Sequence, residues 1–152
     1  MPDDARLHQH WLAQLQENGY RLTAPRRAVV EIVAASQHML DPQMIYEQAR
    51  RQYPRLGLVT VYRTLEKLEQ LGLVQRVHQP QGCQAFIAAA HGHQHPLICQ
   101  VCGRVEYFDG DSEIVESLSS SVSRQSGYRI RDHWLQFFGL CGECQGKNSA
   151  QN

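Results

Sequence analysis

The sequence predicts an α+β protein with an N-terminal winged helix-turn-helix domain and a small C-terminal α/β domain. Two observations predict this division. Apolar residues recur at helical spacing through the first 72 residues, and two Cys-x-x-Cys pairs, Cys99–Cys102 and Cys141–Cys144, lie well behind them. With 152 residues, of which 42% are hydrophobic, the chain has the length of one domain or of two small ones. A second domain this short needs an additional source of stability, because its own hydrophobic core would be marginal.

The apolar spacing predicts four helices in the N-terminal part. They are expected at residues 4–18, at residues 23–35, from Asp41-Pro42 to just before Tyr53, and at residues 60–72. Thr23 and Asp41 are N-cap types that each precede a proline in the first helical turn. Because a short Pro/Gly turn joins the last two helices, they are predicted to form a helix-turn-helix unit.

The fourth helix has the features of a DNA-recognition helix. The side chains near its start that point away from its apolar stripe are Thr60, Tyr62, Arg63 and Thr64. Such residues at the N-terminal end of a recognition helix contact base edges and phosphates. Residues 73–78 and 83–88 are then predicted to be two strands joined by a Pro-Gly turn, which would form the wing. A helical bundle with an edge hairpin and no nucleic-acid partner is the alternative.

Charge is distributed unevenly along the chain. Lys+Arg and Asp+Glu both number 15, so the formal net charge is zero, yet between Gly19 and Arg63 there are seven Arg and only three acidic residues. A locally basic N-terminal part suits a protein that docks one face on a polyanion such as double-stranded DNA. The longest apolar run, residues 85–90, is far below the ~20 residues that span a bilayer, so no membrane partner is expected.

The two cysteine pairs predict a structural zinc site. Each pair can hold one ion from a tight turn, and four thiolates are a ligand set that tetrahedral Zn²⁺ prefers. A disulfide framework and a redox-active pair are the alternatives. The odd number of five cysteines, and a start without an export signal that predicts a cytoplasmic protein, disfavour disulfides. We therefore expect Zn²⁺ at Cys99, Cys102, Cys141 and Cys144, where it would fasten the C-terminal domain.

A histidine cluster directly upstream of Cys99 predicts a second metal site. His91, His93 and His95 alternate along an extended segment, so their imidazoles point to one side. An exposed polar hinge is the alternative. Further candidate ligands are His38, His78, Cys83, Glu106, Glu113 and His133. Imidazole, carboxylate and one thiolate together favour Zn²⁺, whereas nitrogen and oxygen ligands alone would also accept Fe²⁺ or Mn²⁺. The choice of metal then depends on Cys83, which could equally be a small buried side chain.

The C-terminal part is predicted to contain strands at residues 96–101 and 104–109, a helix at 112–125 and a long strand at 128–139. On the helix, Ile114, Leu118 and Val122 recur at four-residue steps. This order leaves apolar sheet and helix surface for a partner subunit to cover, which predicts a homodimer. The polar tail, residues 146–152, is expected to be disordered.

Four segments of the sequence resemble the ferric uptake regulator family, metal-dependent bacterial repressors that include iron, zinc, manganese and peroxide sensors. The matching segments are Arg21-Leu22-Thr23-x-x-Arg26, Thr60-Val61-Tyr62-Arg63-Thr64-Leu65, the histidine cluster running into Cys99-Gln100-Val101-Cys102-Gly103, and His133 followed by Gly139-x-Cys141-x-x-Cys144. The resemblance covers about residues 19–144. It implies a winged-helix domain at residues 1–88, a hinge at 89–96, and a dimerisation domain with the four-cysteine zinc at 97–145.

The resemblance also implies a regulatory metal site between the domains. His93 and His95 correspond to the paired hinge histidines of the family, and His38 corresponds to the histidine that follows the second helix. His133 corresponds to a ligand of a further site, which Glu113 could share. Because these ligands come from both halves of the chain, metal would select the arrangement of the dimer that binds DNA.

The sequence departs from the family pattern in the regulatory site. Ile87 stands where the family usually supplies a carboxylate, and Glu106 lies one residue before the usual acid, which would turn it to the opposite strand face. Cys83, which faces His78 across the wing turn, could replace the missing carboxylate. Members of the family that sense zinc often use one cysteine in this site, which favours zinc.

The sequence thus predicts a metal-responsive transcriptional repressor without enzymatic activity. As a dimer with its corepressor metal, most simply Zn²⁺, it would bind a palindromic operator and control metal-uptake genes. Thr60, Tyr62 and Arg63 would read bases, while Arg21 and Arg26 would contact phosphates or the minor groove. An iron- or manganese-responsive or peroxide-sensing member of the same family is one alternative. A zinc-stapled protein-interaction module is the alternative from another class.

Overall fold

A computed structural model of the chain describes residues 4–78, 82, 84–90, 92–110 and 112–149. The chain falls into two compact units, Met1–Ala89 and Ala90–Asn152. Within the described residues, no helix is both long enough and apolar enough to cross a membrane.

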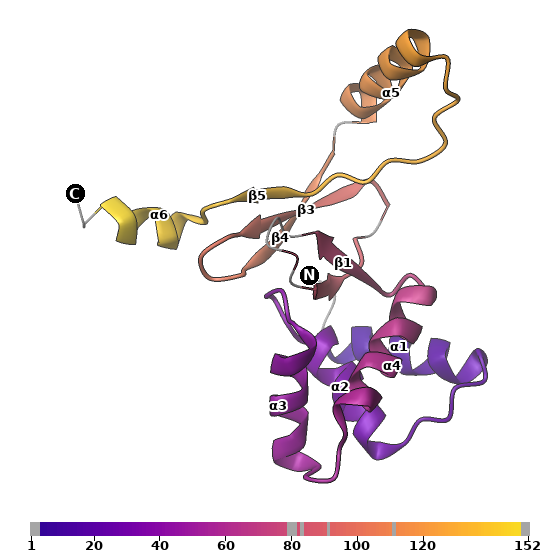
Figure 1. The fold of residues 1–152 in the computed structure, drawn as a ribbon, viewed down its shortest axis with the longest axis vertical. Helices are drawn as coiled ribbons and strands as arrows, with labels where there is room; N and C mark the ends of the chain where they lie inside the picture. The colour runs from indigo at the N-terminus through magenta and orange to yellow at the C-terminus, as the bar shows by residue number, and fades with distance from the viewer. Residues whose placement is uncertain (1–3, 79–81, 83, 91, 111, 150–152) are drawn as a thin grey trace. The chain divides into compact units, whose positions relative to one another are not determined.

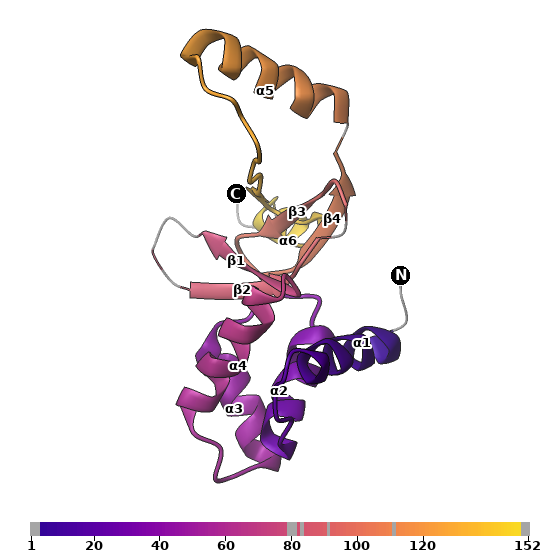
Figure 2. The ribbon, with the colours of Figure 1, turned by 90° about the vertical axis from the view of Figure 1, so that its right-hand side faces the viewer.

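The first unit contains four helices and a two-stranded antiparallel ribbon (Figures 1 and 2). In chain order these are α1 (Asp4–Glu17), α2 (Ala24–Ala34), α3 (Pro42–Gln52), α4 (Leu58–Gln70), β1 (Val74–His78) and β2 (Gln84–Ala88). The structure confirms the four predicted helices, with each end within two residues of its expected place. The predicted hairpin is also confirmed, since β1 pairs with β2 from Val74↔Ala88 to His78↔Gln84.

The starts of the helices have local causes. The Oδ1 atom of Asp41 accepts a hydrogen bond from the backbone N–H of Met44 at 2.7 Å, so Asp41 caps α3 as predicted. Thr23 occupies the equivalent place before α2, but its side chain makes no capping hydrogen bond. Helix α4 begins two residues before its predicted start, because Leu58 packs against the core and brings the first turn into the helix.

The hydrophobic core of the first unit is built from one face of each helix. Its fully buried side chains include Val29, Val30, Ile45, Val61, Leu65 and Leu68. The last three confirm the predicted inward stripe of α4, and burial of each such side chain stabilises the fold by about 1.5–3 kcal/mol. The ribbon is tied to this core through Phe86, whose backbone exchanges hydrogen bonds of 2.8 and 3.0 Å with that of Leu40. The opposite side of α4, which carries Tyr62 and Arg63, is exposed to solvent.

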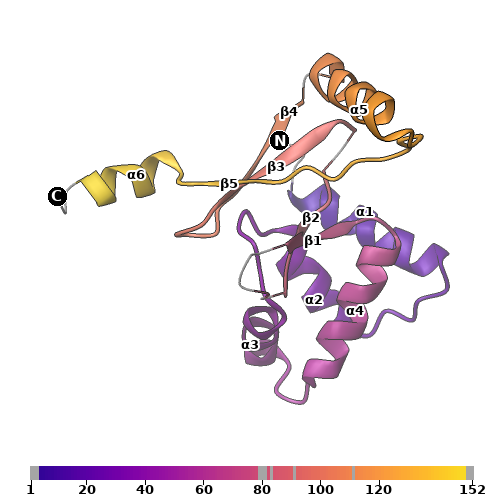
Figure 3. The ribbon, with the colours of Figure 1, turned by 45° about the horizontal axis from the view of Figure 1, so that its top comes forward.

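The second unit contains a three-stranded sheet and two helices (Figure 3). In chain order its elements are β3 (Gln94–Cys99), β4 (Val105–Asp109), α5 (Ser112–Ser126), β5 (Phe137–Gly139) and α6 (Gly142–Ser149). The strand order is β4-β3-β5, with β4 antiparallel and β5 parallel to β3. The central strand β3 thus contains His95 near its start and ends at Cys99.

Three parts of the second unit differ from the prediction. The strand expected at residues 96–101 is β3, Gln94–Cys99, which begins within the predicted hinge of residues 89–96. The strand expected at residues 128–139 is confined to Phe137–Gly139, which pairs with Leu97–Cys99 of β3. Residues 127–136 find no partner strand among the described residues, and a strand needs one for its backbone hydrogen bonds. Residues up to Ser149, which reach into the tail expected to be disordered, are helical in α6. The carbonyl of Cys141 accepts hydrogen bonds from the next turn, so the second cysteine pair itself starts this helix.

Candidate metal centres and nucleic-acid interface

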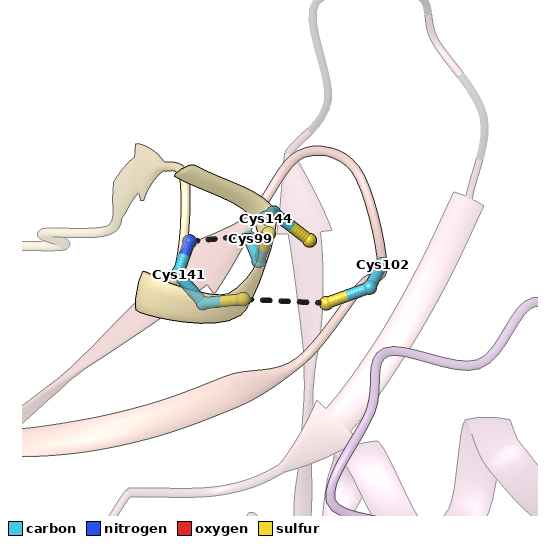
Figure 4. A group of neighbouring side chains, drawn as sticks. All are labelled: Cys99, Cys102, Cys141 and Cys144. Atoms are coloured by element: carbon cyan, nitrogen blue, oxygen red, sulfur yellow. Dashed lines mark hydrogen bonds between the residues drawn. The ribbon is translucent and has the colours of Figure 1, made fainter. Parts of the chain in front are cut away.

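The four paired cysteines converge at one end of the second unit (Figure 4). Cys99 ends β3 and Cys102 lies in the turn before β4, while Cys141 precedes α6 and Cys144 lies in its first turn. Their four sulfur atoms lie within 4.8 Å of one another. All four are free thiols, and the 3.7 Å between the Sγ atoms of Cys102 and Cys141 far exceeds a disulfide bond of about 2.05 Å. The predicted pairing of the two Cys-x-x-Cys motifs into one cluster is confirmed.

The surroundings of the cluster favour thiolates that share a cation. Backbone N–H groups, first that of Cys102 and then that of Cys141, lower the pKa of the Cys99 thiol to about 6; the N–H of Cys141 lies 3.4 Å from the Cys99 sulfur. The pKa of Cys144 is raised to about 12, first by its hydrogen bond with Cys141 and then by burial. Four sulfurs this close cannot all lose their protons without a compensating charge. The donor set therefore fits a metal ion.

A second group of candidate ligands lies elsewhere in the second unit. His95 is buried, with 7% of its surface exposed, and its ring centroid lies 5.4 Å from that of His133. Beside them is a cavity of about 300 Å³, and its lining residues are His93, Val115, Glu116, Ser119, Ser120 and His133. The structure thus brings together three predicted histidines and one carboxylate. This group is less compact than the cysteine cluster. Among the described residues, the four cysteines are the one group of possible metal ligands whose ligand atoms all lie within 4.8 Å of one another.

His95 has the electrostatic character of a neutral ligand. Its Nε2 atom is buried and has no hydrogen-bond partner in the part of the chain described. Burial, and then the proximity of His133 and His93, lowers the pKa of His95, so the imidazole stays uncharged at neutral pH. A buried ring nitrogen without a partner is unusual in proteins, and a neutral imidazole nitrogen is a common metal ligand.

Of the remaining predicted ligands, the structure describes His38, His78, Glu106 and Glu113. His38 is exposed in the segment after α2, and His78 ends β1, so both belong to the first unit. Cys83 and His91 lie outside the described residues. Glu106 lies on β4 and forms an ion pair with Arg104 at 3.0 Å.

Glu116 was not predicted from the sequence. Glu113, which was, does not line the cavity, whereas Glu116 does. The available signal was helical periodicity, because residues three apart share one face of a helix. A carboxylate three residues after Glu113 was therefore an equal candidate partner for His133.

The candidate nucleic-acid surface is the exposed side of α4. Tyr62, with 46% of its surface exposed, and Arg63 stand outward near the start of the helix, and Thr60 is half-buried. Thr64 does not belong with them, although its residue type suggested so. Thr64 is buried, and its hydroxyl donates a hydrogen bond of 2.7 Å to the carbonyl of Thr60.

The two predicted phosphate-contacting arginines are linked to each other. Arg26, in the first turn of α2, donates a hydrogen bond from Nη1 to the carbonyl of Arg21 at 2.8 Å. This contact fixes the loop between α1 and α2 against the start of α2. The guanidinium of Arg26 is thus positioned near the side of α4 that carries Arg63, since both side chains line one pocket.

The sequence profile of the ferric uptake regulator family matches residues 17–138. The chain belongs to the ferric uptake regulator family. It is similar to the ferric uptake regulation protein of Bacillus subtilis (strain 168), with 33% identity over 141 residues that cover 90% of this chain and 93% of that protein. As a member of the ferric uptake regulator family, the chain is a metal-dependent transcriptional regulator.

Solved structures of other regulators share the fold of this ferric uptake regulator family member. The Helicobacter pylori ferric uptake regulator, described as having three functional metal-binding sites, aligns with a TM-score of 0.68 at 24% identity, covering 94% of both chains. A zinc uptake regulator in complex with zinc and DNA aligns with a TM-score of 0.73 at 20% identity, covering 98% of this chain and 99% of that one. These likenesses show that the fold extends over both units of the chain.

Proposed function

We propose that this protein is a repressor that binds a palindromic operator as a homodimer when Zn²⁺ fills its regulatory site. The observation that carries the proposal is the buried, unpartnered Nε2 of His95 beside His133 and a cavity bordered by Glu116. Such a site, in a chain that also presents a recognition helix, supports regulation of DNA binding by a metal ion. Its place of action is then the cytoplasm, and it has no enzymatic role.

The two candidate centres have different tasks in this proposal. Zn²⁺ at the four cysteines is structural, since four thiolates leave no open coordination position. The regulatory ion is held by His93, His95 and His133, with Glu116 as the candidate carboxylate. An ion there would supply positive charge that offsets the carboxylate of Glu116, and the three imidazoles would hold it through neutral nitrogen atoms. His38, His78, Cys83, His91 and Glu106 remain proposed contributors from the segment after α2, the wing, the hinge and β4.

The metal is proposed to be zinc because of its ligands. Nitrogen and oxygen donors alone accept Zn²⁺, Fe²⁺ and Mn²⁺, whereas one thiolate favours Zn²⁺. Cys83 is the fifth cysteine of the sequence and belongs to neither Cys-x-x-Cys pair. Replacing it with Ser is expected to weaken binding of the regulatory metal while leaving the structural metal in place. An iron- or manganese-responsive regulator, or a peroxide sensor, is the alternative if Cys83 plays no part.

The homodimer is supported by the apolar surface of the second unit. Ile114, Leu118 and Val122 on α5 have 68, 62 and 42% of their surface exposed. They lie at four-residue steps and so form one stripe along the helix. A second copy of the chain would cover this stripe, since large exposed apolar patches mark interaction sites. Two winged helices are then presented together, as a palindromic operator requires.

The test is operator binding measured by fluorescence anisotropy on a duplex of the protein's own promoter. Zn²⁺, Fe²⁺ and Mn²⁺ are each buffered separately, with the cysteine-bound metal left in place. We expect Zn²⁺ to switch binding on, and we expect Arg63→Ala to abolish the preference for the promoter even when metal is saturating. Arg124→Ala, on α5 in the second unit, is the matched control and should bind as the wild type does.

Three outcomes would count against the proposal. If Fe²⁺ or Mn²⁺ switches binding on and Zn²⁺ has no effect, that ion is the corepressor in place of Zn²⁺. Binding that is indifferent to every metal would remove the regulatory role of the histidine cluster. Unchanged promoter affinity of Arg63→Ala would remove α4 as the recognition helix and would favour the protein-interaction module.

A further inference from the structure

The first unit contains a pocket that the metal-dependent mechanism does not use. It has a volume of about 310 Å³ and lies where the segment between α1 and α2 meets the side of α4. Its lining residues are Leu15, Tyr20, Leu22, Arg26, Arg63, Thr64, Glu66 and Lys67. Leu15 and Thr64 are buried and close its base, while Arg63 and Glu66 stand at its exposed rim.

The pocket is rich in cationic side chains. Arg26, Arg63 and Lys67 line it together with one acid, Glu66. Among the described residues, none of these three cations forms an ion pair with a carboxylate. Three positive groups that converge without counter-ions create a site for an anion.

Two of the cations are held in place by neutral neighbours. The Nζ atom of Lys67 lies 4.9 Å from the centre of the Tyr20 ring and donates a hydrogen bond of 2.6 Å to Oε1 of Gln70. Arg26 donates one N–H to the carbonyl of Arg21, and its other guanidinium N–H groups are available to a ligand. The site is therefore preorganised before a ligand binds. Binding then loses less conformational entropy, because the long side chains are already ordered.

The position of the pocket on α4 indicates what the anion is. Arg63 is near the base-reading start of the helix, and Lys67 lies one turn later on the same side. Base edges are reached from the N-terminal residues of a recognition helix, whereas groups farther back along it meet the flanking sugar-phosphate backbone. Lys67 and Arg26 would then contact a phosphate while Arg63 reaches the groove.

We propose that this pocket takes a phosphate group and that the source of the phosphate is the backbone of bound DNA. The proposal rests on the proposed function as a DNA-binding repressor and assigns a task to Lys67 and Glu66. Lys67 and Arg26 hold the phosphate and so fix how α4 enters the groove. Glu66 opposes the phosphate and limits the affinity for DNA of any sequence.

The experiment compares two neighbouring charge changes of opposite sign, Lys67→Gln and Glu66→Gln. Anisotropy titrations use the protein's own promoter duplex and a scrambled duplex over a series of salt concentrations, with metal saturating. Loss of one phosphate contact makes the slope of log K against log[salt] shallower by about 0.9, which corresponds to about eightfold weaker binding at about 0.1 M salt. We expect Lys67→Gln to show this change on both duplexes, so that the ratio of the two affinities is unchanged.

Three further variants make the result specific. Glu66→Gln should strengthen binding to both duplexes, and Lys67→Arg, which keeps the charge, should retain the wild-type slope. Arg63→Ala should instead lower the ratio of promoter to scrambled affinity. The helical circular dichroism and melting temperature of Lys67→Gln should match those of the wild type, since Lys67 lies outside the buried core.

The outcomes separate this proposal from the proposed function. If the wild type prefers its promoter but Lys67→Gln keeps the wild-type slope and affinity, the phosphate pocket is wrong and the repressor stands. If the wild type shows no promoter preference with any metal, the proposed function is wrong. If inorganic phosphate at constant ionic strength stabilises the wild type but not Lys67→Gln, while DNA binding of the two is equal, the ligand is a free phosphate and the DNA source is overturned.

Discussion

Gly110 lies against His95, the most buried histidine among the described residues. A Cβ atom at this residue would lie 2.6 Å from Cδ2 and 2.7 Å from Nε2 of His95, closer than carbon and nitrogen atoms approach without displacement. The backbone N–H of Gly110 also donates a hydrogen bond of 3.1 Å to the carbonyl of His93. The absence of a side chain therefore lets the His95 ring lie close to the backbone of Gly110, beside His133. Gly110 therefore acts by positioning an imidazole.

Replacing Gly110 with Ala is expected to push the His95 ring away from His133. Loss of a supporting contact around a metal ligand lowers metal affinity by about 10- to 100-fold, and we expect that range for the proposed regulatory site. The measurement is a competition titration of Zn²⁺ against a chromophoric chelator, with the cysteine-bound metal retained.

The matched control for this substitution is Gly139→Ala. At Gly139 a Cβ atom would meet nothing within 4 Å, so its zinc affinity should equal that of the wild type. If Gly110→Ala binds the second ion as tightly as this control does, the ring of His95 is not positioned by Gly110.

For single residues, the sequence predicted which residues could take part in a site better than it predicted which of them contact each other. The four cysteines were predicted together because the spacing of two Cys-x-x-Cys pairs is itself the geometry of a metal site. The contact of His95 with His133 joins a strand to a segment without regular structure 38 residues later, and no local pattern encodes such a contact. Thr64 was misplaced because residue type does not reveal that its hydroxyl bonds to the preceding helical turn.

Among the elements, α3 offers the sharpest test of a local cause. Asp41 caps it through the 2.7 Å hydrogen bond to the N–H of Met44, and loss of an N-cap of this kind costs about 1 kcal/mol. We expect Asp41→Ala to lower the free energy of unfolding of the first unit by about that amount. The change should appear as a lower urea midpoint with an unchanged slope.

Thr23→Ala is the natural comparison for Asp41→Ala. Thr23 stands at the N-cap of α2, but its side chain makes no capping bond, so this substitution should shift the midpoint much less. Equal shifts for the two variants would mean that helix propensity, and not the hydrogen bond, determines the effect.

Helices were predicted more accurately than strands for a physical reason. The periodicity of a helix is contained in its own sequence, and the stripe of Val61, Leu65 and Leu68 was enough to orient α4. The length of a strand depends on its neighbour, and β5 ends where its pairing with β3 ends. Alternating apolar residues at 128–136 could not reveal this limit.

At the scale of the whole molecule, the two units differ in what holds them together. The first unit has an extensive core drawn from all four helices. In the second unit, the apolar side chains that the structure describes as buried are few, with Ile98, Cys99 and Cys144 among them, while its large apolar side chains are mostly exposed. A domain with so little core is expected to rely on the metal proposed at its four cysteines and on the proposed partner subunit.

Removal of the cysteine-bound metal with a strong chelator is therefore expected to unfold only the second unit. Hydrogen exchange followed by mass spectrometry should show loss of protection in β3, β4 and α6, with α2 and α4 unchanged. Sedimentation should show conversion of the dimer to monomer at the same chelator concentration.

The comparison variant is Cys141→Ser, which removes one thiolate without any chelator and should reproduce the effect. Uniform loss of protection over both units would show that they fold as one cooperative body. Full protection of the second unit without metal would show that its core suffices.

The central strand of the second unit has a consequence for how this protein can change over evolutionary time. His95 and Cys99 are four residues apart on β3, so they face the same side of the strand and lie about 13 Å apart. Substitutions between them, for instance at the half-exposed Leu97, leave that relation intact. Insertion or deletion of a single residue would turn one of the two proposed ligands to the opposite face of the strand. Lineages descended from this chain should therefore vary in the identity of residues 96–98 and keep their number fixed.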